Sequence, residues 1–103
     1  MEYSISGEVV CRGLHCNKEL RKFSDKRAKE WLETLDEHNR TGGVQYRFLF
    51  EREGTGHLFT CTAVAHSQTH NWYSHDWGNS PSEALVRSLK QMRATSEEYR
   101  SVG

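Results

Sequence analysis

Four lysines recur every three or four residues between Asn17 and His38, and lysines at this spacing are suited to binding phosphate groups. Such positions share one face of an α-helix. A row of mobile ammonium groups binds a polyanion by neutralising several phosphates and releasing their counterions. The segment therefore suggests a nucleic-acid-binding face, made of Lys18, Lys22, Lys26 and Lys29 with Arg21 at its edge. The alternative is a solvated helix face with acid–base pairs, such as Glu30 near Lys26.

Aromatic side chains alternate in the stretch from His70 to Trp77. Tyr73, His75 and Trp77 would lie on one side of a strand and Trp72 on the other. Aromatic rings exposed on a sheet can stack on unpaired bases. They can also shield the sheet or pack across strands, and we favour this second interpretation because no lysine or arginine lies between them.

Cysteine and histidine supply the ligand types that bind zinc. The candidates are Cys11, His15, Cys16, Cys61, His66, His70 and His75. No C-x-x-C pair is present, and Cys11 and Cys61 fit buried strand positions, so we predict no metal site. Three cysteines are an odd and small number, which is untypical of a disulfide framework. Reduced thiols are therefore expected.

A cysteine nucleophile needs a positioned base and an oxyanion hole. Cys16 follows His15 directly in the sequence, which places the two side chains poorly for each other. No glycine-rich phosphate loop, nucleophile elbow or pair of acidic residues is visible. We therefore predict that the protein is not an enzyme and has no cofactor and no small-molecule substrate.

The composition fits one small domain. The chain has 103 residues, of which 35% are hydrophobic. It has 14 basic and 14 acidic residues and a formal net charge of +0, so only local clustering of cations could favour nucleic acid. Outside the lysine face, the surface should then be acidic. No apolar run is long enough for a membrane span or a signal sequence, so we expect a cytoplasmic protein without membrane contact.

Two helices are predicted. The first runs from Asn17, a plausible N-cap, to about His38 and Asn39, where Thr41-Gly42-Gly43 interrupts it. Its apolar stripe consists of Leu20, Phe23, Ala28, Trp31, Leu32 and Leu35. The second begins at Ser80-Pro81-Ser82-Glu83, a capping box with proline at the first helical position. It should bury Ala84, Leu85, Leu89 and Met92 and direct Arg87, Lys90 and Arg93 outward.

Four strands are predicted from alternating apolar residues, and turn residues separate the last three. They span Tyr3–Cys11 with a bulge at Gly7, Val44–Glu51, His57–His66 and His70–Trp77. In the third, the small residues Cys61, Ala63 and Ala65 should lie under the helices. The order β-α-β-β-β-α predicts an α+β two-layer sandwich, with a four-stranded sheet and both helices on one face. Residues 1–95 would form the domain and residues 96–103 a flexible tail.

The order of elements and several short segments resemble the bacterial family of ribosome hibernation-promoting factor and ribosome-associated inhibitor A, which includes sigma-54 modulation-like proteins. The resemblance covers about Tyr3 to Met92. Its matching pieces are Ile5-Ser6-Gly7, Leu20-Arg21-Lys22-Phe23, Leu32-Glu33, the central hairpin, and Ala84-Leu85 after the turn at Gly78.

The resemblance implies a non-enzymatic translation inhibitor of stressed or idle cells. Family members bind the small ribosomal subunit in the channel for mRNA and tRNA, largely through basic residues of the two helices. The matching positions for binding rRNA are Arg21, Lys22, Lys26, Lys29, Lys90 and Arg93, and the helix faces add Lys18 and Arg87.

Two other interpretations remain. The chain could be a metal-binding or protein-interaction module of the same fold without RNA contact. A double-stranded-RNA-binding domain has a similar layout, but it needs lysines where this chain has Pro81, Ser82 and Glu83. The sequence leaves open the oligomeric state, the rRNA positions contacted, and whether ribosomes are paired or only inhibited.

Overall fold

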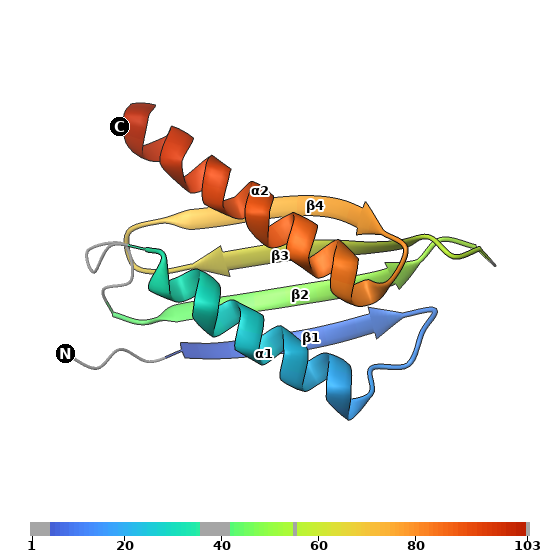
Figure 1. The fold of residues 1–103 in the computed structure, drawn as a ribbon. Coiled ribbons are helices and arrows are strands. Elements are labelled where there is room, and N and C mark those ends of the chain that lie inside the picture. The colour runs from blue at the N-terminus through green and yellow to red at the C-terminus, as the bar shows by residue number, and fades with distance from the viewer. Residues whose placement is uncertain (1–4, 36–41, 55, 103) are drawn as a thin grey trace.

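The computed structural model describes residues 5–35, 42–54 and 56–102, and from residue 93 onward the backbone alone. A four-stranded sheet has two helices on one face, as predicted (Figure 1). The elements are β1 (Ile5–Arg12), α1 (Lys18–Glu33), β2 (Val44–Arg52), β3 (Phe59–His66), β4 (Asn71–Gly78) and α2 (Pro81–Val102). The strands lie in the order β1-β2-β3-β4, with β1 parallel to β2 and the other pairs antiparallel. The parallel pair is possible because α1 returns the chain to the same end of the sheet.

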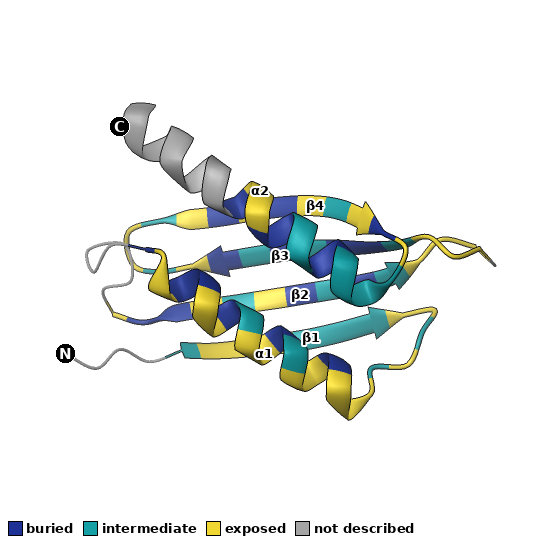
Figure 2. Cartoon of the chain, in the orientation of Figure 1, coloured by how far each residue is buried: buried dark blue, intermediate teal, exposed yellow. Residues whose placement is uncertain are grey.

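The core lies between the helices and the sheet (Figure 2). Cys61, Ala63 and Ala65 of β3 are buried there, which confirms their predicted place. The buried Ser88 hydroxyl of α2 donates to the Cys61 carbonyl oxygen at 2.7 Å. Small side chains on β3 let α2 approach close enough for this hydrogen bond. The bond fixes the position of α2 over β3, in addition to the apolar packing between them.

The first helix starts where the sequence predicts and ends earlier. The Asn17 side chain accepts from the Leu20 amide at 2.8 Å, which confirms the N-cap. The helix ends at Glu33 and not near His38, and residues 36–41 lie outside the described part. Its last turn tightens because the Thr34 amide and hydroxyl both donate to the Trp31 carbonyl, at 2.9 and 2.6 Å. A threonine hydroxyl that bonds to the backbone in this way competes with continued helix.

The second helix also differs from the prediction, at the side chain of Glu83. The Ser80 hydroxyl caps it by accepting from the Glu83 amide at 3.1 Å, as expected. The Glu83 carboxylate, however, is directed to Arg87 at 3.0 Å, so it serves an ion pair where the capping box predicted a bond to Ser80. The backbone of the helix continues to Val102, and the predicted division into a domain to residue 95 and a flexible tail of residues 96–103 stays a prediction.

The predicted bulge at Gly7 is wrong. Gly7 pairs with Tyr46 in an uninterrupted register between β1 and β2. A Cβ atom at Gly7 would overlap the Tyr46 ring, so the glycine is required by the close approach of this ring. The limits of the other strands shift by one or two residues. Residues 1–4, including Tyr3 of the predicted first strand, lie outside the described part.

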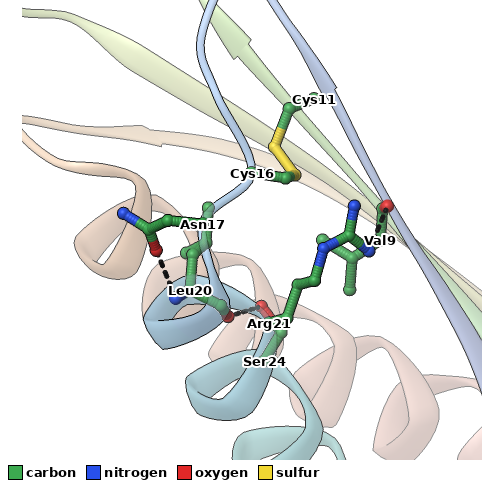
Figure 3. The surroundings of a disulfide bond; sticks show 7 residues. All are labelled: Val9, Cys11, Cys16, Asn17, Leu20, Arg21 and Ser24. Atoms are coloured by element: carbon green, nitrogen blue, oxygen red, sulfur yellow. Dashed lines mark hydrogen bonds between the residues drawn. A yellow bond between two sulfur atoms is a disulfide. The ribbon is translucent and has the colours of Figure 1, made fainter.

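The expectation of three reduced thiols is also wrong. Cys11 at the end of β1 and Cys16 before α1 form a disulfide, with Cα atoms 5.6 Å apart (Figure 3). Gly13 between them has φ +76°, a left-handed conformation that glycine adopts readily, so the chain can turn back within a short loop. Only Cys61 is a free cysteine among the described residues.

Reduction of this disulfide should destabilise the fold modestly. A closed loop of six residues corresponds to about 2 kcal/mol of unfolded-state entropy. We expect dithiothreitol to lower the free energy of unfolding in urea by about 2 kcal/mol. The double variant Cys11→Ser/Cys16→Ser should match the reduced protein and no longer respond to dithiothreitol. An unchanged urea midpoint after complete reduction would contradict a stabilising bond.

Candidate nucleic-acid interface

Lys18, Lys22, Lys26 and Lys29, the lysine row, lie on the side of α1 that faces away from the sheet. All four are exposed, while Ser24, Ala28 and Leu32 pack against the core. Positions spaced by three and four residues stay on one face of the helix, so the ammonium groups project into solvent together. The sequence prediction that these four cations share an outward face is confirmed.

The acidic residues beside the lysine row are held on the flanks of the helix. On one flank, Asp25 accepts a hydrogen bond from the Tyr46 hydroxyl of β2. Burial, together with this bond and the negative charge of Asp25, raises the pKa of Tyr46, so the hydroxyl stays a donor. On the flank toward α2, Glu30 pairs with Arg27 at 3.2 Å. The pairing of Glu30 with Lys26, which the alternative of a solvated helix face would include, is therefore not observed.

As a result, neither Asp25 nor Glu30 neutralises the lysine row. Within the described parts of the chain, none of its four lysines forms an ion pair. Glu33, one turn beyond, is the carboxylate that falls on the same exposed face. A cation without an internal partner is available to bind a phosphate, and several in a row bind cooperatively with a polyanion.

The arginines at the margins of the predicted face are committed to the sheet. Arg21 donates to the Val9 carbonyl of β1 at 3.5 Å (Figure 3). Arg87 donates to the Trp77 carbonyl of β4 at 3.4 Å, with its guanidinium 4.5 Å from the Trp77 ring centre. Because β1 and β4 are the two edges of the sheet, the structure separates these arginines and does not bring all eight predicted cations into one patch.

The second helix adds a cation at the groove between the helices. Lys90 is exposed on the side of α2 opposite its buried residues, as predicted. The side chain of Arg93 lies outside the described part. A groove of about 90 Å³ separates the helices and is lined by Arg27, Glu30, Trp31, Val86, Leu89 and Lys90. Lys90 thus extends the basic surface from α1 across the helix layer.

Sequence reasoning missed Arg27. Arg27 lies on the side of α1 that faces α2, between the apolar stripe and the polar face. Helical periodicity alone therefore assigns it to neither the core nor the lysine row. Its guanidinium lies 5.3 Å from the Phe23 ring centre and, with Lys90, lines the groove. Only the placement of α2 beside α1 gives Arg27 this position. The lysine row and Lys90 are therefore outward-facing cations of the helix layer, while Arg27 is half-buried in the groove between the helices and paired with Glu30.

The other candidate chemistries receive no support from the geometry. No group of three metal-ligand side chains lies together in the parts of the chain that the structure describes. Cys16 is in a disulfide, so in this state it holds no thiolate nucleophile beside His15. Burial raises the pKa of Cys61 to about 12, which keeps that thiol protonated at neutral pH. Across the described residues, no helix has the length and apolarity to cross a membrane.

The aromatic residues of β4 lie on the face of the sheet that no helix covers. Tyr73 is 62% exposed and Trp77 is 47% exposed, while Trp72 is buried on the helix side. This confirms the predicted division of the strand into two sides. The favoured interpretation, that these rings shield the sheet or pack across strands, stays a prediction, and one face of the Trp77 ring is packed against Arg87.

Comparison with known proteins shows a shared fold without detectable sequence relationship. No protein-family model matches the chain, and no curated protein matches it. The Protein Y N-terminal domain of Thermus thermophilus superposes with a TM-score of 0.72 at 9% identity, covering 89% of this chain and 94% of that one. A ribosomal subunit interface protein from Coxiella burnetii gives a TM-score of 0.71 at 8% identity, covering 93% and 98%. The predicted likeness to this group of proteins is confirmed at the level of the fold.

Proposed function

We propose that this protein binds the small ribosomal subunit through its helix layer and holds the ribosome inactive, as a member of the hibernation-factor family. The exposed lysine row, together with Lys90 of α2, contacts rRNA phosphates. The protein acts by occupying the channel for mRNA and tRNA and performs no chemical reaction. This role places it in the cytoplasm and ties its activity to stress or starvation.

The observation that carries the proposal is that no lysine of the row forms an ion pair with any residue that the structure describes. A solvated helix face with internal acid–base pairs would have its carboxylates among the lysines. Here Asp25 is bound by Tyr46 and Glu30 by Arg27, so both acids are held at the flanks. Glu33 lies on the same face one turn beyond the row, and it forms no ion pair with the four lysines. The protein is neutral overall, so this local separation of charge orients it with the helix layer toward a polyanion. The likeness of fold to a ribosomal subunit interface protein supports the same partner.

Co-sedimentation with purified small and large ribosomal subunits tests the proposal. We expect binding to the small subunit that weakens steeply with salt. If the four lysines and Lys90 contact about four or five phosphates, the affinity should fall about 150- to 500-fold between ~50 and ~200 mM salt. Equal binding to both subunits, or binding that does not respond to salt, would contradict the proposed interface.

A further inference from the structure

The face of the sheet opposite the helices, the open sheet face, has its side chains in rows fixed by the strand register. Alternation along each strand and the pairing of all four strands place them. The central row is Val10, Leu49, Thr62 and His75, and the 2.8 Å hydrogen bond between Thr62 and His75 confirms that these neighbours share the face. On one side of it lie Glu8, Arg47, Val64 and Tyr73, and on the other Arg12, Glu51, Thr60 and Trp77. A fourth row of polar side chains, Ser6, Gln45, His66 and Asn71, lies beyond the row of Glu8 and is not one of these three.

These three rows are complementary to themselves. A half-turn about an axis along the central row lays a second copy face to face on the first and exchanges the two outer rows. Glu8 then lies opposite Arg12 of the second copy, and Arg47 lies opposite its Glu51. Tyr73 lies opposite Trp77 at the β4 side, and the apolar Val10 and Leu49 meet their own copies at the axis.

We propose that the open sheet face binds a second copy of this chain, forming a two-fold symmetric dimer with the sheets packed face to face. A two-fold interface must be self-complementary, because each contact occurs twice. On the open sheet face, β1 carries one acidic and one basic side chain, and so does β2. The half-turn matches every one of these charges with its opposite, and it places ring against ring.

The charges involved are available for contact between copies. Among the described residues, Glu8, Arg12, Arg47 and Glu51 form no ion pair within one copy. Glu8, Arg12 and Arg47 are exposed and Glu51 is half-buried. Charge pairs at the margin of an interface mainly fix its register and exclude wrong arrangements. Val10 and Leu49 in the central row and the rings of Tyr73 and Trp77 on β4 provide the apolar area.

The size of the face predicts a weak association. The four strands have eight or nine residues each. At about 4.8 Å between strands and 3.3 Å per residue, the three rows that the half-turn superposes measure roughly 19 by 20 Å, or about 380 Å² per copy. A total of about 750 Å² is smaller than a stable specific interface, so a weak, transient dimer that forms only at high protein concentration is expected. Such a dimer leaves both lysine rows exposed on opposite sides.

Single-stranded RNA is the other occupant that exposed rings on a sheet can serve. The charges of the face argue against it. Arg12 and Arg47 are balanced by Glu8 and Glu51 in the same rows, so the face has no net positive charge from these groups to hold a phosphate backbone. The same balance of charges favours a second copy.

Sedimentation velocity of the full chain from about 10 to 500 μM provides the test. We expect wild-type protein to pass from monomer to dimer over this range. Arg47→Glu places two carboxylates opposite each other, and Glu51→Arg places two guanidinium groups opposite each other. Each variant alone should dimerise at least tenfold more weakly. An equimolar mixture should form dimers, because each copy then presents the opposite charge to the other.

The double variant Arg47→Glu/Glu51→Arg should also dimerise by itself. If Glu51→Arg fails to fold, as judged by circular dichroism, the exposed pair Glu8→Arg and Arg12→Glu repeats the same test. A chain that stays monomeric throughout, or a mixture no more associated than its components, overturns the proposal. Binding of a fluorescent oligouridine to a monomeric chain, lost in Tyr73→Ala, overturns it as well and assigns the face to RNA.

Discussion

The double variant Lys22→Glu/Lys26→Glu is expected to bind small ribosomal subunits at least 100-fold more weakly than the wild type at ~0.1 M salt. Each phosphate contact contributes a salt exponent of about 0.9, so losing two contacts costs about 60-fold at this concentration. The introduced carboxylates add repulsion from rRNA. The variant should also show a shallower salt dependence, with a slope smaller by about 1.8. Co-sedimentation across a salt series measures both quantities.

The loss should come without unfolding. Lys22 and Lys26 are exposed, and the described residues offer them no ion pair to lose. Lysine and glutamate have similar helix propensities, so the urea midpoint should change little.

The matched control is Arg12→Glu/Arg47→Glu, which changes the net charge equally on the open sheet face. It should retain binding, because at nanomolar protein the proposed dimer is not populated. Equal release by both double variants would mean that total charge, and not the helix layer, governs binding. Retained binding in Lys22→Glu/Lys26→Glu would contradict the helix-cation mechanism directly.

The fold could be predicted because its signals are local. Alternation in Val44–Glu51 fixed one strand with its two faces, and Asn17 and Ser80 marked the helix starts. The side chains that meet across the core follow from these periods, as with Cys61 under α2. The predictions that were wrong concern features that depend on residues far apart in the sequence, or on a single competing hydrogen bond. The end of α1 was set by the Thr34 hydroxyl, whose effect the helical period does not reveal.

The candidate site was predictable in part for the same reason. The spacing of the lysine row determines its common face, whatever packs below it. The roles of Arg21 and Arg87 could not be derived, because they depend on which strands lie at the two edges of the sheet. Arg27 depends on the distance between the helices. The disulfide required the left-handed turn at Gly13 within the connector, and the count of cysteines argued against it.

The second large effect concerns stability. Trp72→Ala should lower the free energy of unfolding by about 3–5 kcal/mol, the usual cost of removing a large buried aromatic side chain. Trp72 is 2% exposed, and its ring meets Trp31 of α1 edge to face with centres 5.3 Å apart. Removing its side chain leaves a cavity between α1 and the sheet. A domain of this size has a free energy of unfolding of about 5–15 kcal/mol in total. The midpoint of urea unfolding of Trp72→Ala should therefore be well below that of the wild type.

Trp72→Phe distinguishes ring packing from the chemistry of the indole. The Nε1–H group of Trp72 is buried without an acceptor among the described residues, and so is that of Trp31. An unsatisfied buried donor costs about 1–3 kcal/mol, so phenylalanine removes this cost while it keeps most of the ring contact. We therefore expect Trp72→Phe to lose less than about 1.5 kcal/mol. The neighbouring Tyr73→Ala, on the exposed side of the same strand, should lose less than about 1 kcal/mol. If Trp72→Phe unfolds as easily as Trp72→Ala, the indole nitrogen is bound in solution and the packing argument fails.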